Sequence, residues 1–144
     1  MNKPEYVSTQ EVQRVCQELG LRDWTQLGET RISLEEAKLI QQAVGGVAEQ
    51  ISSVDFQQGL QIELEHGAQF PDANVTNNHP LLTGMIVLAH LKEMLDYYTR
   101  LAVAEIEGDL LKAFRANNPE KMIQKYSLLL QARAELIAKE IEKS

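Results

Sequence analysis

The sequence predicts an all-α protein, a bundle of about five helices that ends in a long antiparallel helical hairpin. Apolar residues recur at three- and four-residue spacing in every long segment, as expected for helices with one buried face. Residues that begin and end helices separate these segments, and no segment alternates between apolar and polar residues as a half-buried strand would. With 144 residues, 44% of them hydrophobic, the chain can bury one modest core.

Three amphipathic helices are expected in the first half of the chain. The first spans residues 9–20, with Ser8 or Thr9 as its N-cap and a glycine at its end. The second, over residues 33–44, begins with a capping box in which a glutamate follows a serine after three positions. The third spans residues 53–66 and also ends at a glycine. A loop rich in Asn, Asp and Pro follows, because these residues favour turns over helix.

A long fourth helix is expected over residues 80–114, because no proline interrupts this stretch and apolar residues recur along it. Gly108 is a position at which this helix could kink, since glycine costs about 1 kcal/mol relative to alanine inside a helix. An Asn-Pro pair at Pro119 ends this helix and starts a fifth, which continues to about Glu142. At ~1.5 Å per residue the fourth helix would be roughly 50 Å long. Part of the hairpin is therefore expected to project from the core, unless the helix kinks near Gly108 or packs on another subunit.

Charge divides the chain into two parts. Residues 1–80 hold five basic and 12 acidic residues, which accounts for the whole net charge of -7, whereas residues 81–144 hold nine of each. The acidic balance argues against a nucleic-acid binder, because phosphate contacts need an excess of Lys and Arg.

We expect a helical core over residues 1–101 and a hairpin extension over residues 102–144. The leading hypothesis is a binding or assembly module that forms a homodimer through its C-terminal helices and offers its acidic part to a protein partner.

No feature of the sequence indicates export or membrane insertion. The first 12 residues are polar and lack the apolar core of a signal peptide. The longest apolar window, residues 80–89, is far shorter than the ~20 residues of a spanning helix. The single cysteine, Cys16, excludes an intramolecular disulfide framework and multi-cysteine metal sites. A cytoplasmic protein without membrane contact is expected.

Two mirrored motifs contain the candidate metal-binding residues of this sequence. Glu63 and His66 form an E-x-x-H motif, and His90 and Glu93 form an H-x-x-E motif. Residues three positions apart share a helix face, so each motif presents a carboxylate and an imidazole together. Helical di-iron sites use E-x-x-H for this reason, and two His with one or two Glu also suffice for a single Zn²⁺ or Fe²⁺ ion. The residues expected to form a supporting polar network are Glu65, Asn74, Thr76, Asp96 and Tyr97.

The relative direction of the two helices separates the interpretations. In antiparallel helices Glu63 faces Glu93 and His66 faces His90, which favours a cation between the like groups. In parallel helices Glu63 meets His90, and His66 meets Glu93, as ion pairs that need no metal. Three hypotheses are therefore open for this cluster: an iron or zinc site, a buried structural network, and a pocket for a small molecule or a partner.

A longer pattern in the chain resembles a known family. Its segments are F-Q-Q-G-L, E-L-E-H-G, N-V-T-N, P-L-L-T-G, L-A-H-L-K-E and D-Y-Y-T-R-L, all within residues 34–101. They resemble a family of short, mostly helical bacterial and phage proteins of unassigned function. The resemblance implies no activity, and the first helix and residues 102–144 extend beyond the pattern. It implies only that the following residues occupy motif positions: Glu63, Glu65, His66, Asn74, Thr76, His90, Glu93, Asp96 and Tyr97.

Overall fold

The structure is a computed structural model, and it describes residues 7–142. Within these residues it contains six α-helices, two short 3₁₀-helices and no strand, which confirms the all-α prediction. The chain forms two compact units, Met1–Glu93 and Met94–Ser144. The division between these units follows the fourth helix, so it lies before residue 101, where the sequence placed the end of the core domain.

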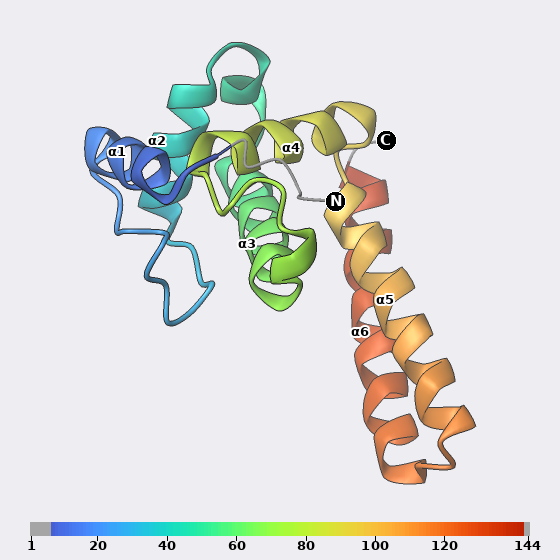
Figure 1. The fold of residues 1–144 in the computed structure, drawn as a ribbon. Helices are drawn as coiled ribbons and strands as arrows, with labels where there is room; N and C mark the ends of the chain where they lie inside the picture. The colour runs from blue at the N-terminus through green and yellow to red at the C-terminus, as the bar shows by residue number, and fades with distance from the viewer. Residues whose placement is uncertain (1–6, 143–144) are drawn as a thin grey trace. The chain divides into compact units, whose positions relative to one another are not determined.

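The two units contain four and two α-helices. The helices of the first unit are α1 (Thr9–Leu19), α2 (Leu34–Val44), α3 (Ser53–Gln69) and α4 (Pro80–Glu93), with 3₁₀-helices at Gly46–Gln50 and Pro71–Ala73. The helices of the second unit are α5 (Tyr97–Arg115) and α6 (Pro119–Glu142), as Figure 1 shows.

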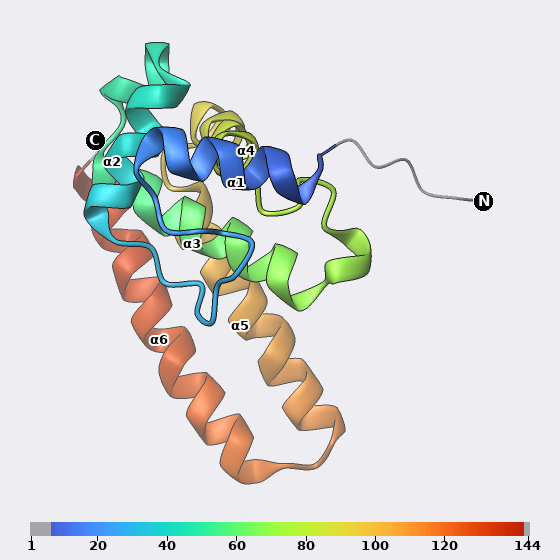
Figure 2. The ribbon, with the colours of Figure 1, turned by 60° about the vertical axis from the view of Figure 1, so that its left-hand side comes forward.

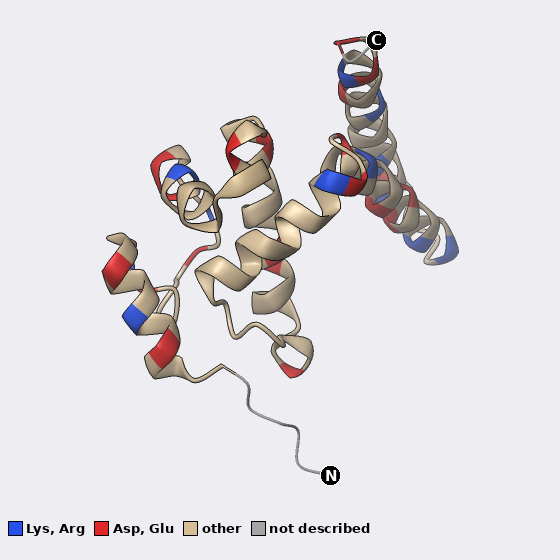
Figure 3. Ribbon diagram, turned by 90° about the horizontal axis from the view of Figure 1, so that it is seen from above, with Lys and Arg blue, Asp and Glu red and all other residues tan. Residues whose placement is uncertain are grey.

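In the first unit, α4 packs against both α2 and α3, and α1 lies against α2 and α4. Figures 1 and 2 show that α4 crosses α3 instead of running beside it. α4 is apolar around most of its circumference, and its charged side chains are confined to its last turn (Figure 3). Even so, none of the described helices is both long and apolar enough to cross a membrane. The largest buried side chains of this unit are Val12, Trp24, Ile32, Ile40, Phe56, Leu60, Leu64, Val87 and Leu91.

The ends of α1 and the start of α2 form as their sequence signals predict. The Ser8 hydroxyl accepts a hydrogen bond from the backbone N–H of Glu11 at 3.2 Å. Gly20 ends α1 with a φ of 68°, a left-handed conformation that carries no steric cost for glycine. Ser33 and Glu36 form the reciprocal capping box, in which both hydrogen bonds measure 3.1 Å.

α3 is longer than expected, because it continues through Gly67 to Gln69 instead of ending at His66. A Cβ atom at Gly67 would lie 2.7 Å from the Asn78 side-chain oxygen and 3.1 Å from the Asn74 amide. The missing side chain therefore permits a close approach of the loop before α4. It does not mark the end of the helix, as the sequence pattern had indicated.

The prediction of one continuous helix over residues 80–114 is wrong. The break falls between α4 and α5, whereas Gly108, the candidate position for a kink, lies inside α5. Asp96 occupies the N-cap position of α5, and in the preceding turn the Tyr97 N–H donates to the Met94 carbonyl at 3.1 Å. Aspartate favours helix starts over helix interiors, although the Asp96 side chain makes no capping hydrogen bond here and pairs with Arg100. Since neither proline nor glycine occurs at the break, this weaker signal was the one available in the sequence.

α5 and α6 form the predicted antiparallel hairpin. Asn117 has a φ of 50°, and the Asn118 N–H donates to the Ala113 carbonyl at 3.1 Å, which closes the turn. The Asn118 side chain then caps α6 by accepting from the Lys121 N–H at 3.1 Å, and Pro119 begins the helix as expected. Ion pairs that join the two helices include Asp109–Lys125 at 2.7 Å, Glu107–Arg133 at 3.0 Å and Arg100–Glu140 at 2.8 Å.

Gly84 permits the packing of α4 on α2. A Cβ atom there would lie 2.9 Å from the Cγ2 atoms of both Ile40 and Val44, and these β-branched side chains have few other rotamers. We expect Gly84→Ala to lower the free energy of unfolding by about 1–3 kcal/mol, measured by urea denaturation. Gly108→Ala is the matched control, because no atom lies within 4 Å of a Cβ there. It should raise stability by about 0.5–1 kcal/mol, and a Gly84→Ala protein as stable as the wild type would contradict the packing argument.

His79 is a buried titratable residue next to the start of α4, and only 6% of its surface is exposed. Its Nδ1 accepts a hydrogen bond from the Leu82 N–H at 3.4 Å, and its Nε2 lies 3.9 Å from a carboxylate oxygen of Glu11 on α1. Burial lowers the pKa of His79 below its ordinary value, and the Glu11 carboxylate only partly opposes this effect. Arg14, which is paired with Glu11, lowers the His79 pKa further.

The folded protein should therefore lose stability in mildly acidic solution. His79 in the unfolded chain has the ordinary pKa of 6.5, so below this pH the unfolded chain binds more protons than the folded one. The His79 contribution is fully present above pH 6.5 and is lost as the pH falls toward the lower pKa of the folded state. We expect His79→Asn, which keeps an acceptor near the Leu82 N–H, to flatten the dependence of unfolding free energy on pH between about 7.5 and 5.5. Equal slopes for the wild type and His79→Asn would contradict this prediction.

Candidate functional site

The structure brings Glu63, His66 and His90 together. The Glu63 Oε2 lies 3.9 Å from His66 Nδ1 within α3, and its Oε1 lies 3.6 Å from His90 Nε2 on α4. The Glu63 side chain is 16% exposed, compared with 42% for His66 and 32% for His90. The carboxylate is therefore the most buried of the three groups and has an imidazole on each side.

Neither predicted helix direction describes this cluster, because α3 and α4 cross. The approach of Glu63 to His90 is one of the two contacts expected for parallel helices. Glu93, the fourth predicted ligand, is exposed at the last residue of α4. A crossing brings residues together at one point along each helix, so residues one turn away diverge. The two motifs therefore do not pair along their full length.

The iron or zinc hypothesis gains no support from the described part of the chain. Over residues 7–142, no group of three or more His, Cys, Asp or Glu side chains is placed to hold a metal ion. The two oxygens of Glu63 lie toward different imidazoles. A metal site would instead need all the donors to face one point.

Three of the expected supporting residues lie in the first unit and form separate contacts. The Asn74 side-chain N–H donates to the Asn78 oxygen at 2.8 Å, and the Thr76 hydroxyl donates to the Asn74 oxygen at 3.2 Å. Both hydrogen bonds join residues within the loop before α4. Glu65 is exposed and accepts a hydrogen bond from Gln61 at 3.3 Å.

The other two expected supporting residues, Asp96 and Tyr97, belong to the second unit. The Asp96 carboxylate is paired with Arg100 at 2.8 Å, and Arg100 is also paired with Glu140 at 2.8 Å. These carboxylates raise the pKa of the Arg100 guanidinium, with Asp96 contributing most. The Tyr97 ring meets the Tyr98 ring edge to face, with ring centroids 5.1 Å apart. Asp96 therefore helps to join the start of α5 to the end of α6.

A pocket of about 370 Å³ lies beside Glu63, between α3, the following loop and α4. We call it the α3–α4 pocket. Its volume falls within the range of roughly 300–1,000 Å³ that is typical of small-molecule sites. The sequence pattern identified several of its lining residues but missed its apolar wall, because an apolar side chain in a loop or helix carries no mark of pocket lining. The residues lining the pocket are Glu63, His66, Gly67, Phe70, Ala73, Asn74, Val75, Thr76, Thr83 and Ile86.

A second candidate surface runs along the hairpin, because α6 carries two apolar stripes. One stripe faces α5 and includes the buried side chains of Leu129 and Ala132. The other stripe is exposed. Its members, with their exposed fractions, are Ile123 (74%), Tyr126 (54%), Leu130 (51%), Ile137 (55%) and Ile141 (69%).

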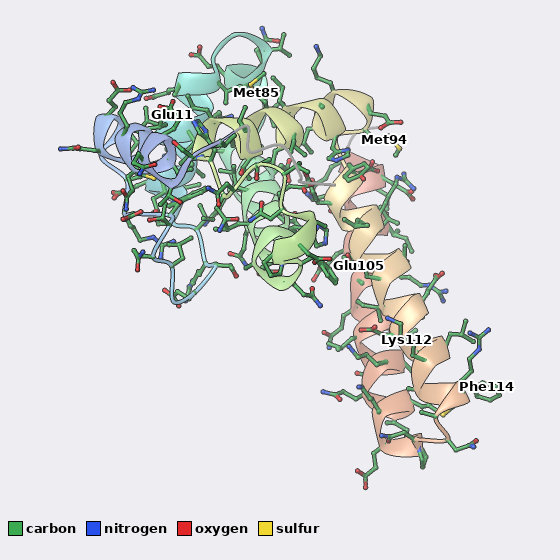
Figure 4. The ribbon with its side chains drawn as sticks, in the orientation of Figure 1. Glu11, Met85, Met94, Glu105, Lys112 and Phe114 are labelled. Atoms are coloured by element: carbon green, nitrogen blue, oxygen red, sulfur yellow. The ribbon has the colours of Figure 1, made fainter. Side chains whose placement is uncertain are left out.

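Two side chains of α5 extend the exposed stripe. Leu111 and Phe114 are 47% and 61% exposed, and Figure 4 shows Phe114 projecting outward near the tip of the hairpin. Together with Ile123, Tyr126 and residues further along both helices, they line a groove of about 650 Å³. Large contiguous apolar surfaces are uncommon on monomeric proteins and mark interaction sites. We call this surface the hairpin face, and it consists of Leu111, Phe114, Ile123, Tyr126, Leu130, Ile137 and Ile141.

Comparison with protein families gives one match, to the family described as Protein of unknown function (DUF5661), over residues 12–107. The chain belongs to this family. The DUF5661 match is wider than the pattern seen in the sequence, because it includes most of the first helix, which that pattern left out. It contains the whole α3–α4 pocket and ends inside α5, so α6 lies beyond it. No curated protein and no solved structure matches the chain.

Proposed function

We propose that this chain is a binding and assembly module that forms a homodimer through its hairpin face. The observation that carries the proposal is the second apolar stripe of α6, which α5 leaves exposed. A hairpin of two helices can cover one stripe of each helix. A second hairpin laid against the first makes a four-helix bundle, in which both stripes of α6 are buried.

The spacing of the stripe favours another helix as its partner. Ile123, Leu130 and Ile137 follow one another at seven-residue intervals, with Tyr126 three residues after Ile123 and Ile141 four residues after Ile137. This is the repeat by which helices pack side chains into the spaces between side chains of a neighbouring helix. Such a stripe is self-complementary, so two copies can use the same surface in a closed two-fold arrangement.

Charge supports a second copy of the chain as the occupant. Residues 97–142 contain seven basic and seven acidic residues, so two hairpins carry no net repulsion. Figure 3 shows both signs distributed along α5 and α6. The net charge of -7 in residues 1–80 instead favours a different protein partner with a basic surface for the first unit.

The same charges favour an antiparallel dimer. With α6 antiparallel to its copy and the two-fold axis crossing the exposed stripe at the level of residue 132, Ile123 of one copy lies opposite Ile141 of the other. Tyr126 then lies opposite Ile137. In this arrangement the acidic N-terminal segments of the two copies join their hairpins at opposite ends of the paired α6 helices. α6 has 24 residues and is about 36 Å long. This separation exceeds the Debye length of about 8 Å in physiological salt, whereas a parallel dimer would join both acidic segments at one end.

Light scattering or sedimentation equilibrium tests the dimer. We expect a mass of twice the 16.3 kDa of one chain. A double substitution, Ile123→Glu with Leu130→Glu, should give a monomer, because it places charge in the apolar contact. The matched control, Gln124→Glu with Gln131→Glu, adds the same charge at adjacent exposed positions and should stay dimeric. A monomeric wild type, or equal dissociation of both variants, would refute the proposal.

Disulfide cross-linking tests the antiparallel orientation separately. Ile123→Cys and Ile141→Cys proteins are oxidised alone and after mixing, and the products are separated by non-reducing electrophoresis. We expect cross-linked dimers in the mixture and few in either protein alone, because these two positions face each other only between antiparallel copies. Cys16 is 2% exposed, so the wild type serves as the background. Efficient cross-linking of each protein alone, with none between the two, would indicate a parallel dimer.

A further inference from the structure

The α3–α4 pocket has walls that the fold holds in place. Gly67 packs closely against the side chains of Asn74 and Asn78, which are hydrogen-bonded to each other at 2.8 Å. The Asn77 side chain donates to the Val7 carbonyl at 3.2 Å and so ties the loop to the segment before α1. Asn77 and Asn78 adopt positive φ angles of 49° and 57°, which the surrounding contacts must maintain. A pocket with fixed walls loses little conformational freedom when a ligand binds.

The charge of the pocket favours a cation. Glu63 supplies a carboxylate that is 16% exposed and that has the imidazoles of His66 and His90 beside its two oxygens. Neither Lys nor Arg is among the described residues that line the pocket. The Thr76 hydroxyl and the Asn74 side chain add hydrogen-bonding oxygens to the same cavity. The net charge of -7 over residues 1–80 also attracts cations and repels anions.

The apolar part of the pocket lining favours an apolar body on the same ligand. Phe70, Val75 and Ile86 line the pocket together with Ala73. Phe70 and Val75 are 51% and 79% exposed. A ligand that covers them removes apolar surface from water, which is favourable in proportion to the area covered.

We propose that the α3–α4 pocket binds a small organic amine. Its ammonium group pairs with the Glu63 carboxylate, and its apolar body lies against Phe70 and Ile86. This site differs from the hairpin face in both location and chemistry, since it lies wholly in the first unit and selects a cation. The proposal therefore does not depend on the dimer.

The test compares three probes of similar shape and different charge. Phenethylamine is a cation at neutral pH, phenethyl alcohol is neutral and hydrocinnamate is an anion. Each is titrated into the full-length protein and followed by calorimetry and by NMR shifts of the residues that line the pocket. We expect saturable binding of the amine with a Kd of about 1 mM or tighter. The alcohol should bind at least about tenfold more weakly, because it carries no positive charge to pair with the Glu63 carboxylate, and hydrocinnamate should bind most weakly.

Glu63→Gln should weaken amine binding by at least about tenfold and should leave alcohol binding unchanged. Glu65→Gln is the matched control, because Glu65 lies on the same helix, is exposed and does not line the pocket. It should bind the amine as the wild type does. Equal binding of amine and alcohol by the wild type, no saturable amine binding, or undiminished amine binding by Glu63→Gln would each overturn the proposal. The comparison of probes on the wild type remains decisive if Glu63→Gln fails to fold.

Discussion

The crossing of α4 over α2 and α3 is the contact on which the first unit depends. It requires Gly84, because a side chain there would meet the methyl groups of Ile40 and Val44 at 2.9 Å. The close packing places His90 beside Glu63 and leaves the α3–α4 pocket between α4 and the loop that precedes it. One missing side chain thus sets both the core and the candidate binding site. The same close packing holds His79 in its buried position near α1.

The sequence allowed prediction of those features that depend on neighbouring residues. Ser8, Gly20 and the Ser33–Glu36 capping box act through bonds within one turn of helix, so their patterns are sufficient to place helix ends. The turn at Asn118 and the antiparallel hairpin follow from local geometry in the same way. The E-x-x-H motif also predicted a true proximity, because residues three apart on a helix share a face.

Features that depend on distant contacts were not predictable in this way. The angle between α3 and α4 is set by packing across the core, and it decides that Glu63 meets His90 while Glu93 lies exposed. Glycine at position 67 is typical of a helix end. In the structure it instead allows the Asn74 and Asn78 side chains to pack closely against α3. The break before α5 contains neither proline nor glycine, so a rule based on neighbouring residues predicts that the helix continues there. The lining of the pocket could not be read from the sequence for the same reason.

The two units present different chemistry to their surroundings. The first unit carries the family match, the acidic charge and a pocket with one carboxylate. The second unit is neutral and exposes a continuous apolar stripe, and most of it lies beyond the family match. The proposed ligand site and the proposed dimer contact therefore belong to different units.

The small interior of the hairpin has a thermodynamic consequence. Within its described residues, the buried apolar side chains are Tyr98, Ala113, Leu129 and Ala132. So few buried groups offset little of the conformational entropy lost when α5 and α6 become ordered. In a homodimer, the remaining free energy comes from the second copy, so folding of this segment follows mass action. The fraction of molecules in which α5 and α6 are folded then depends on the concentration of the protein in the cell.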